Sequence, residues 1–174
     1  ARIIMEKGYR LPVDALFATA QSLYSPDISW KLDKESCLAK LSEFFAGRVK
    51  NYFLTRGANT LLVEAAIGAG CQDVWAAMRR LAALEAESAK PDFAKTAQTF
   101  KRVSNILRKQ GVDAPKTYAR DLFSEQPEFA LAEALDALDT TFDGLWKSDR
   151  FEDLFALLGS IRPVVDAFFD GVMV

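Results

Sequence analysis

The segment FAKTAQTFKRVSNILRKQ, residues Phe93–Gln110, repeats its apolar positions with the period of an α-helix and has two different faces. At about 100° per residue, one side collects an apolar stripe that is wide enough to join a core. The members of this stripe are Phe93, Thr96, Phe100, Val103 and Leu107. A second arc collects cations and one carboxamide, with no carboxylate among them: Lys101, Arg102, Asn105, Arg108 and Lys109. A nucleic-acid backbone binds such a surface, and the alternative is an ordinary solvated helix face that is basic.

Helical periodicity continues along most of the chain on both sides of this segment. The expected helices cover residues 1–7, 13–24, 34–55, 60–67, 72–88, 93–110, 128–141 and a last one from residue 149 toward 171. The residues expected to begin, end or bend them are Gly8, Pro12, Ser25, Pro26, Asp33, Gly57, Asn59, Pro91, Gly111, Pro127, Asp149 and Pro163. Residues 112–125 are expected to be loop-rich. No segment alternates with a period of two and no hairpin signal is present, so we predict an all-α bundle of six to eight helices.

The composition limits the class of protein further. A chain of 174 residues with 50% hydrophobic content can bury one good core. The net charge of −2 conceals a basic run over residues 95–109 and an acidic run from Asp121 to Asp143. No apolar run is long enough for a bilayer and no signal peptide opens the chain, so we expect a cytoplasmic protein that does not bind membranes. Both ends, Ala1 and Val174, lie inside apolar-periodic runs, and we expect a piece of a longer protein.

Residues that could perform catalysis or bind a metal are largely missing. The chain contains no histidine, the commonest general base and metal ligand. Cys37 and Cys71 do not form a C-x-x-C pair, and we expect both to be reduced core residues. The chain has no glycine-rich phosphate loop and no nucleophile motif. Asp136 and Asp139 lack a third ligand, so we predict no metal site and no catalytic residue.

A second set of basic residues belongs to the helix expected over residues 34–55. The periodicity predicts Arg48 in the middle of an apolar face, between Phe44 and Tyr52. Burying an unpaired guanidinium is costly, so Arg48 should meet either an internal carboxylate or an outside anion at the edge of the core. Lys50 and Arg56 add positive charge nearby, although each could be a solvated helix residue.

Three segments occur in the same order and at similar spacing in one known family: FFAGRVKNYFLTRG, FKRVSNILRK and IRPVVDAFFDGVMV. From Arg2 to Val174 the chain resembles the C-terminal region of the beta subunit of bacterial glycyl-tRNA synthetase. The opening RIIMEKGYRLPVDALF is similar to the stretch before the tRNA-binding domain of that subunit. The region is also similar to the helical anticodon-binding domain of arginyl-tRNA synthetases. The resemblance implies an N-terminal segment over residues 1–30 and a C-terminally truncated anticodon-binding domain over residues 31–174.

The resemblance also implies a function. The family joins glycine to its tRNA with ATP and Mg²⁺, and the ATP and glycine pocket lies mainly in the alpha subunit. This region would hold the anticodon arm without a cofactor of its own. Its partners would be glycine-accepting tRNA, the alpha subunit and a second beta subunit. The candidate tRNA-binding residues are Arg48, Lys50, Arg56, Lys101, Arg102, Asn105, Arg108 and Lys109.

Physical chemistry suggests a role for each part of this surface. Lys101, Arg102, Arg108 and Lys109 would neutralise phosphates, and Asn105 would read a base edge or make a structural hydrogen bond. An aromatic platform for unstacked bases could come from Tyr52, Tyr118 or Trp146, each of which could equally be a core residue. The acidic run should face away from RNA. The alternative function is a non-catalytic helical protein-interaction module whose basic face docks an acidic partner.

Overall fold

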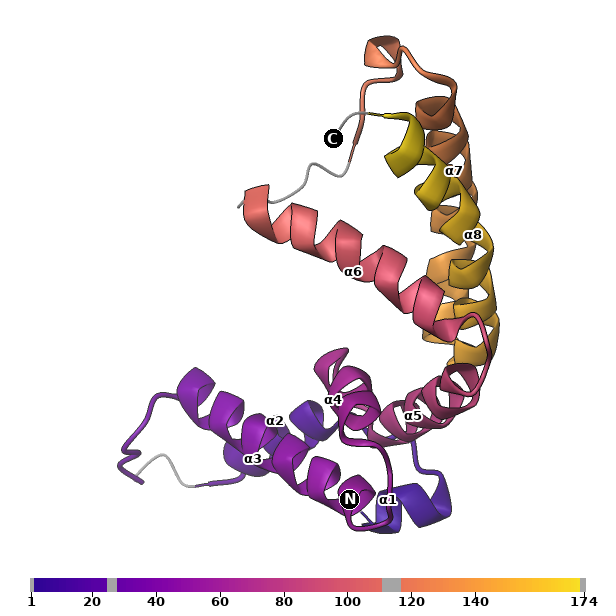
Figure 1. The fold of residues 1–174 in the computed structure, drawn as a ribbon. Coiled ribbons are helices and arrows are strands. Elements are labelled where there is room, and N and C mark those ends of the chain that lie inside the picture. Colours follow the sequence, from indigo (N-terminus) through magenta and orange to yellow (C-terminus); the bar gives the residue numbers. More distant parts are fainter. Residues whose placement is uncertain (1, 25–27, 111–116, 173–174) are drawn as a thin grey trace. The chain divides into compact units, whose positions relative to one another are not determined.

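The computed structural model describes residues 2–24, 28–110 and 117–172 of the 174-residue chain. In these residues it contains eight α-helices, one short 3-10 helix and no strand (Figure 1). The α-helices are α1 (Arg2–Lys7), α2 (Val13–Ser22), α3 (Lys34–Leu54), α4 (Thr60–Gly68), α5 (Val74–Ser88), α6 (Phe93–Gln110), α7 (Gln126–Lys147) and α8 (Phe151–Gly171). The 3-10 helix η1 is Arg120–Leu122. The prediction of an all-α chain with six to eight helices is confirmed.

Capping chemistry explains where several helices begin and end. Asp33 accepts a hydrogen bond from the backbone N–H of Ser36 at 2.8 Å and so caps α3. Asn59 caps α4 in the same way, accepting the backbone N–H groups of the first turn at 2.9 and 3.4 Å. Gly57 follows α3 with φ +87°, a left-handed conformation that glycine adopts without strain. Ser25, Pro26 and Gly111, which were expected to end helices, lie outside the described residues.

The junction between α7 and α8 differs from the prediction. We expected a helix that ends at Thr141 and an N-cap at Asp149, whereas α7 continues to Lys147 and α8 begins at Phe151. Asp149 instead adopts φ 53° and belongs to the end of α7. Its N–H donates to the carbonyl of Trp146 at 3.2 Å, and the N–H of Arg150 donates to the carbonyl of Leu145 at 2.9 Å. These two bonds form a Schellman motif, which reverses the chain in a few residues.

The chain divides into two compact units, Ala1–Glu85 and Ala86–Val174. The first unit contains α1, α2, α3 and α4. Its core consists of Met5, Val13, Val49, Phe53, Val63, Ala66, Val74 and Leu81. Arg80 of α5 is buried and donates hydrogen bonds to the carbonyls of Ala66 and, at 3.0 Å, Gly70, which ties α5 to the end of α4. The division into an N-terminal segment over residues 1–30 and an anticodon-binding domain over residues 31–174 was predicted from the resemblance, and it stays a prediction.

In the second unit, α7 and α8 form an antiparallel pair that packs along its length (Figure 1). The buried side chains of this pair are Ala132, Leu145, Phe151, Leu154, Ile161 and Val165. The end of α8 closes on the start of α7 at Gly171, where a Cβ atom would lie 2.8 Å from Cγ of Pro127. Helix α6 packs beside this pair, against α8.

The apolar stripe of α6 does not become a buried core face, contrary to the prediction. Phe93, Phe100 and Val103 are half-buried, and Leu107 is 45% exposed. Among the α6 residues whose burial is described, the buried one is the polar Thr99, which is 8% exposed. The reason is that α8 is the main neighbour of α6 in this unit, and α8 covers the side of the helix on which Thr99 lies. Among the described residues, no helix combines the length and the apolar character needed to cross a bilayer.

Candidate nucleic-acid interface

An open groove of about 680 Å³ runs between α6 and α8 in the second unit. Its α6 wall consists of Lys95, Gln98, Thr99, Lys101, Arg102, Asn105, Ile106 and Lys109, and its α8 wall of Arg162 and Asp166. The charged lining therefore comprises five cations and one carboxylate. None of the lining residues belongs to α7, which carries most of the acidic run. The groove has an excess of positive charge, and this excess is the property that an anionic ligand requires.

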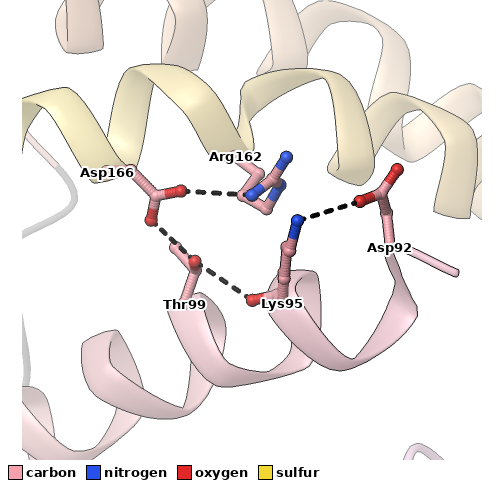
Figure 2. A network of polar contacts seen from close by, with 5 residues as sticks. All are labelled: Asp92, Lys95, Thr99, Arg162 and Asp166. Carbon is pink, nitrogen blue, oxygen red and sulfur yellow. Dashed lines mark hydrogen bonds and ion pairs between the residues drawn. The ribbon is translucent and has the colours of Figure 1, made fainter.

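The single carboxylate in this lining is held by its neighbours (Figure 2). Thr99 Oγ1 donates to Asp166 Oδ1 at 2.7 Å, and Arg162 Nη1 donates to Asp166 Oδ2 at 3.5 Å. Because Thr99 is on α6 and Asp166 is on α8, the hydrogen bond also joins the two walls of the groove. Asp166 thus balances the charge of Arg162, while the cations farther along α6 keep their charge available to a ligand.

The lysines of α6 are weakly engaged within the protein. Lys95 Nζ lies 3.7 Å from Asp92 Oδ1, but the two side chains are 70% and 71% exposed, so water screens this pair strongly. Lys101 and Lys109 are exposed, and neither forms an ion pair with a carboxylate of the described residues. Exposed lysine side chains without an ion pair can follow a phosphate without first breaking an internal bond.

Arg102 differs from these lysines because it rests on an aromatic ring. Its Cζ atom lies 4.0 Å from the centroid of the Phe169 ring of α8. A cation over a ring face at this distance is attracted by the ring quadrupole, which restricts the rotamers of the arginine. Arg102 nevertheless remains exposed and lines the groove. It is the one arginine of α6 in this lining, since Arg108 is exposed on α6 but does not line the groove.

The structure corrects the expectation for Arg48. This residue is exposed rather than set in an apolar core face, and its guanidinium lies 5.8 Å from the ring centroid of Phe44. Phe44 is itself 65% exposed. The buried side of α3 is instead centred on Val49 and Phe53, one helix step away from the expected centre. Water solvates the guanidinium of Arg48, so its charge demands no buried partner.

The two other basic candidates of the first unit already have partners. Lys50 Nζ lies 2.7 Å from Glu64 Oε1 of α4, and the Arg56 guanidinium lies 3.6 Å from the ring centroid of Tyr52. The groove is built wholly from the second unit, so it brings together four of the predicted residues and none of those on α3. The four are Lys101, Arg102, Asn105 and Lys109.

The aromatic candidates of the second unit, Tyr118 and Trp146, both have partners within the protein. The hydroxyl of Tyr118 donates to the Asp136 carboxylate, and its ring stacks on Phe123 with centroids 5.8 Å apart. The hydrogen bond to Asp136 raises the pKa of Tyr118, and the same bond lowers the pKa of Asp136. Arg120 also pairs with this carboxylate. Trp146 stacks against Phe142 at 6.2 Å. Neither ring lines the groove.

Comparison with known proteins shows which proteins the chain is similar to. No family model matches the chain. Over 178 residues the chain is 50% identical to the glycine–tRNA ligase beta subunit of Nitratidesulfovibrio vulgaris, an alignment that covers 100% of the chain and 25% of that subunit. The beta subunit of Oleidesulfovibrio alaskensis is 48% identical over the same shares of both chains. That of Geobacter metallireducens is 37% identical over 99% of the chain and 24% of the subunit.

The chain is homologous to part of the glycine–tRNA ligase beta subunit. It spans about a quarter of the length of these relatives. The predicted resemblance to this family is therefore confirmed over the whole chain. The homology concerns the chain as a region of that subunit, and the groove between α6 and α8 lies inside the matched region.

Sequence reasoning did not assign a role to several residues in and beside the groove. Lys95, Arg102 and Lys109 are seven residues apart, and Gln98 and Asn105 are also seven apart. That spacing returns a residue to nearly the same helix face, so the pattern could have shown that Lys95 and Gln98 extend the basic arc. Arg162 and Asp166 could not be assigned to the groove, nor Phe169 to Arg102, because only the packing of α8 on α6 brings these residues together.

Proposed function

We propose that the groove between α6 and α8 binds the anticodon arm of glycine-accepting tRNA on behalf of glycine–tRNA ligase. The observation that carries this proposal is the groove lining, in which five cations accompany a single carboxylate that Thr99 and Arg162 already engage. An RNA stem and loop presents closely spaced phosphates and unstacked bases, and it requires a surface that is open, positive and able to make hydrogen bonds.

The side chains of the groove divide into two roles. Lys101 and Lys109 are flexible point charges that would neutralise backbone phosphates, giving affinity without sequence information. Asn105 lies between them on α6, and its carboxamide offers both donors and an acceptor to a base edge. Arg108, outside the groove lining, would add to the long-range positive potential that attracts the RNA.

The wider reaction follows from the relatives, which carry the name glycine–tRNA ligase beta subunit. We infer that the complete protein takes part in joining glycine to tRNA with ATP and Mg²⁺ in the cytoplasm, together with an alpha subunit and a second beta subunit. In this proposal the present region selects and holds tRNA and contributes no catalytic residue. Arg48, Lys50 and Arg56 remain proposed secondary contacts, of which Lys50 would first have to leave Glu64.

The proposal is tested by measuring binding of transcribed glycine tRNA and of a mismatched tRNA across a salt series. Each neutralised phosphate contributes about 0.7–0.9 to the slope of log K against log salt. With Lys101, Arg102 and Lys109 in contact with RNA, the slope should be about 2–3 and glycine tRNA should bind more tightly. Binding that is equal for glycine tRNA, mismatched tRNA and heparin would contradict the proposal.

Matched variants then separate the roles. Lys109→Ala should weaken all tRNAs alike and lower the salt slope by about one. Asn105→Ala should instead reduce the difference in binding affinity between glycine tRNA and the mismatched tRNA. Lys147→Ala is the control, because Lys147 is an exposed lysine of α7 that pairs with Asp143 outside the groove. If the region is instead a protein-interaction module, tRNA should bind no more tightly than any other polyanion, with or without the Lys101→Glu substitution. Lys101→Glu would then abolish binding to an acidic protein.

A further inference from the structure

Arg102 and Phe169 form an arrangement that phosphate binding does not explain. A phosphate contact needs only a mobile cation, which Lys101 and Lys109 already supply. Arg102 is instead held over an aromatic ring contributed by another helix, with Cζ 4.0 Å from the ring centroid. The ring of Phe169 thus lies against the guanidinium, while Arg102 is also exposed and lines the groove.

We infer that Arg102, supported by Phe169, is the stacking platform for an unpaired nucleobase in this groove. Unstacked RNA bases stack on arginine planes as well as on aromatic rings. A planar guanidinium whose rotamer is already restricted loses little further freedom when a base covers it. This inference rests on the proposed function and changes the predicted role of Arg102 from a phosphate contact to a base contact. It also explains how the groove can hold a base although no aromatic side chain lines it.

Two neighbouring features fit this role. Asn105 lies three residues after Arg102 on α6, and side chains at this spacing are adjacent on a helix. A base stacked on Arg102 therefore brings its hydrogen-bonding edge toward the Asn105 carboxamide. The second feature is Asp166, the carboxylate of the groove lining, which Thr99 and Arg162 engage. Asp166 consequently does not draw Arg102 away from the ring of Phe169.

The discriminating variant is Arg102→Lys, which keeps the positive charge and removes the planar group. A phosphate contact would survive this change with the affinity for glycine tRNA altered less than about twofold. A stacking contact would be lost, which should weaken binding about 5- to 100-fold while the salt slope stays the same. Arg150→Lys is the matched control, since Arg150 is an exposed arginine of the second unit that pairs with Asp153 outside the groove lining.

A fluorescence measurement reports stacking directly. Glycine tRNA transcripts carrying 2-aminopurine at single positions of the anticodon loop should show a quenched or shifted probe at one position with the unmodified chain and with Arg150→Lys. The signal at that position should be lost with Arg102→Lys and reduced with Phe169→Leu. Urea unfolding of Phe169→Leu checks that loss of the ring leaves the second unit folded. The Arg102→Lys variant tests the stacking role even if Phe169→Leu does not fold.

The outcomes distinguish this inference from the proposed function. Specific, salt-dependent binding of glycine tRNA that Arg102→Lys leaves unchanged in both affinity and probe signal would overturn the stacking role alone. Failure of the unmodified chain to prefer glycine tRNA over heparin would overturn the proposed function, and the stacking role with it.

Discussion

Replacing Thr99 by valine should loosen the groove without changing its charge. The Thr99 hydroxyl has a single proton, and the carboxylate of Asp166 at 2.7 Å is a closer acceptor than the Lys95 carbonyl at 3.2 Å (Figure 2). Valine has nearly the same shape and cannot donate. The substitution therefore removes the hydrogen bond that joins α6 to α8 and leaves the surrounding packing in place.

The size of the effect follows from the exposure of the two partners. Hydrogen bonds to charged groups contribute about 1.5–3 kcal/mol when they are well buried. Thr99 is 8% exposed, but the Asp166 side chain is 43% exposed, so water can replace part of the lost bond. We therefore expect Thr99→Val to lower the free energy of unfolding by about 1 kcal/mol. For a chain of this size the melting temperature should fall by about 2–4 °C.

Urea unfolding followed by circular dichroism measures this change, and a double-mutant cycle with Asp166→Ala, which removes the acceptor, isolates the pair. The losses of unfolding free energy in the two single variants should sum to about 0.5–1.5 kcal/mol more than the loss in the double variant. The reason is that either substitution alone already breaks the hydrogen bond. Glycine tRNA binding by Thr99→Val should also weaken although every cation is retained. Strictly additive effects in the cycle, or a Thr99→Val stability equal to that of the unmodified chain, would refute the claim that this bond joins the walls of the groove.

Three further outcomes follow from the structure. Arg80→Ala removes the buried guanidinium that donates to two carbonyls at the end of α4, and it should lower the free energy of unfolding by about 2 kcal/mol. The control is Arg79→Ala at the neighbouring position, which should change this free energy by less than about 0.5 kcal/mol. Asn59→Ala removes the N-cap of α4 and should lower that free energy by about 1 kcal/mol in urea. The hydrogen bond to Asp136 raises the pKa of Tyr118, so its stabilising effect is present below about pH 10 and is lost as the pH rises through the raised pKa. In an ultraviolet titration of the phenol, Asp136→Asn should move this pKa back toward the ordinary tyrosine value, and an unchanged titration would show that the bond is absent.

Local chemistry made much of the fold predictable. The all-α class, the start of α3 after Asp33 and the start of α4 after Asn59 depend on periodicity and on hydrogen bonds within a few residues. The end of α7 was not predicted, because its last turns are stabilised partly by packing: Leu145 is buried in the pair with α8. Asp149 was misassigned for a related reason, since aspartate both caps helices and tolerates the left-handed conformation that a Schellman turn requires.

By itself the sequence determined which side chains share a face of α6, because helix geometry places residues seven apart in register. It therefore indicated the basic arc and the central Asn105. The relation to the glycine–tRNA ligase beta subunit was indicated separately, by the resemblance of three sequence segments. Tertiary structure alone decided that α8 packs against the Thr99 side of α6, which placed Arg162 and Asp166 opposite the lysines and Phe169 beneath Arg102. The physical reason is that a helical period specifies directions around one axis, whereas a groove and its charge balance depend on which neighbouring helix covers which direction.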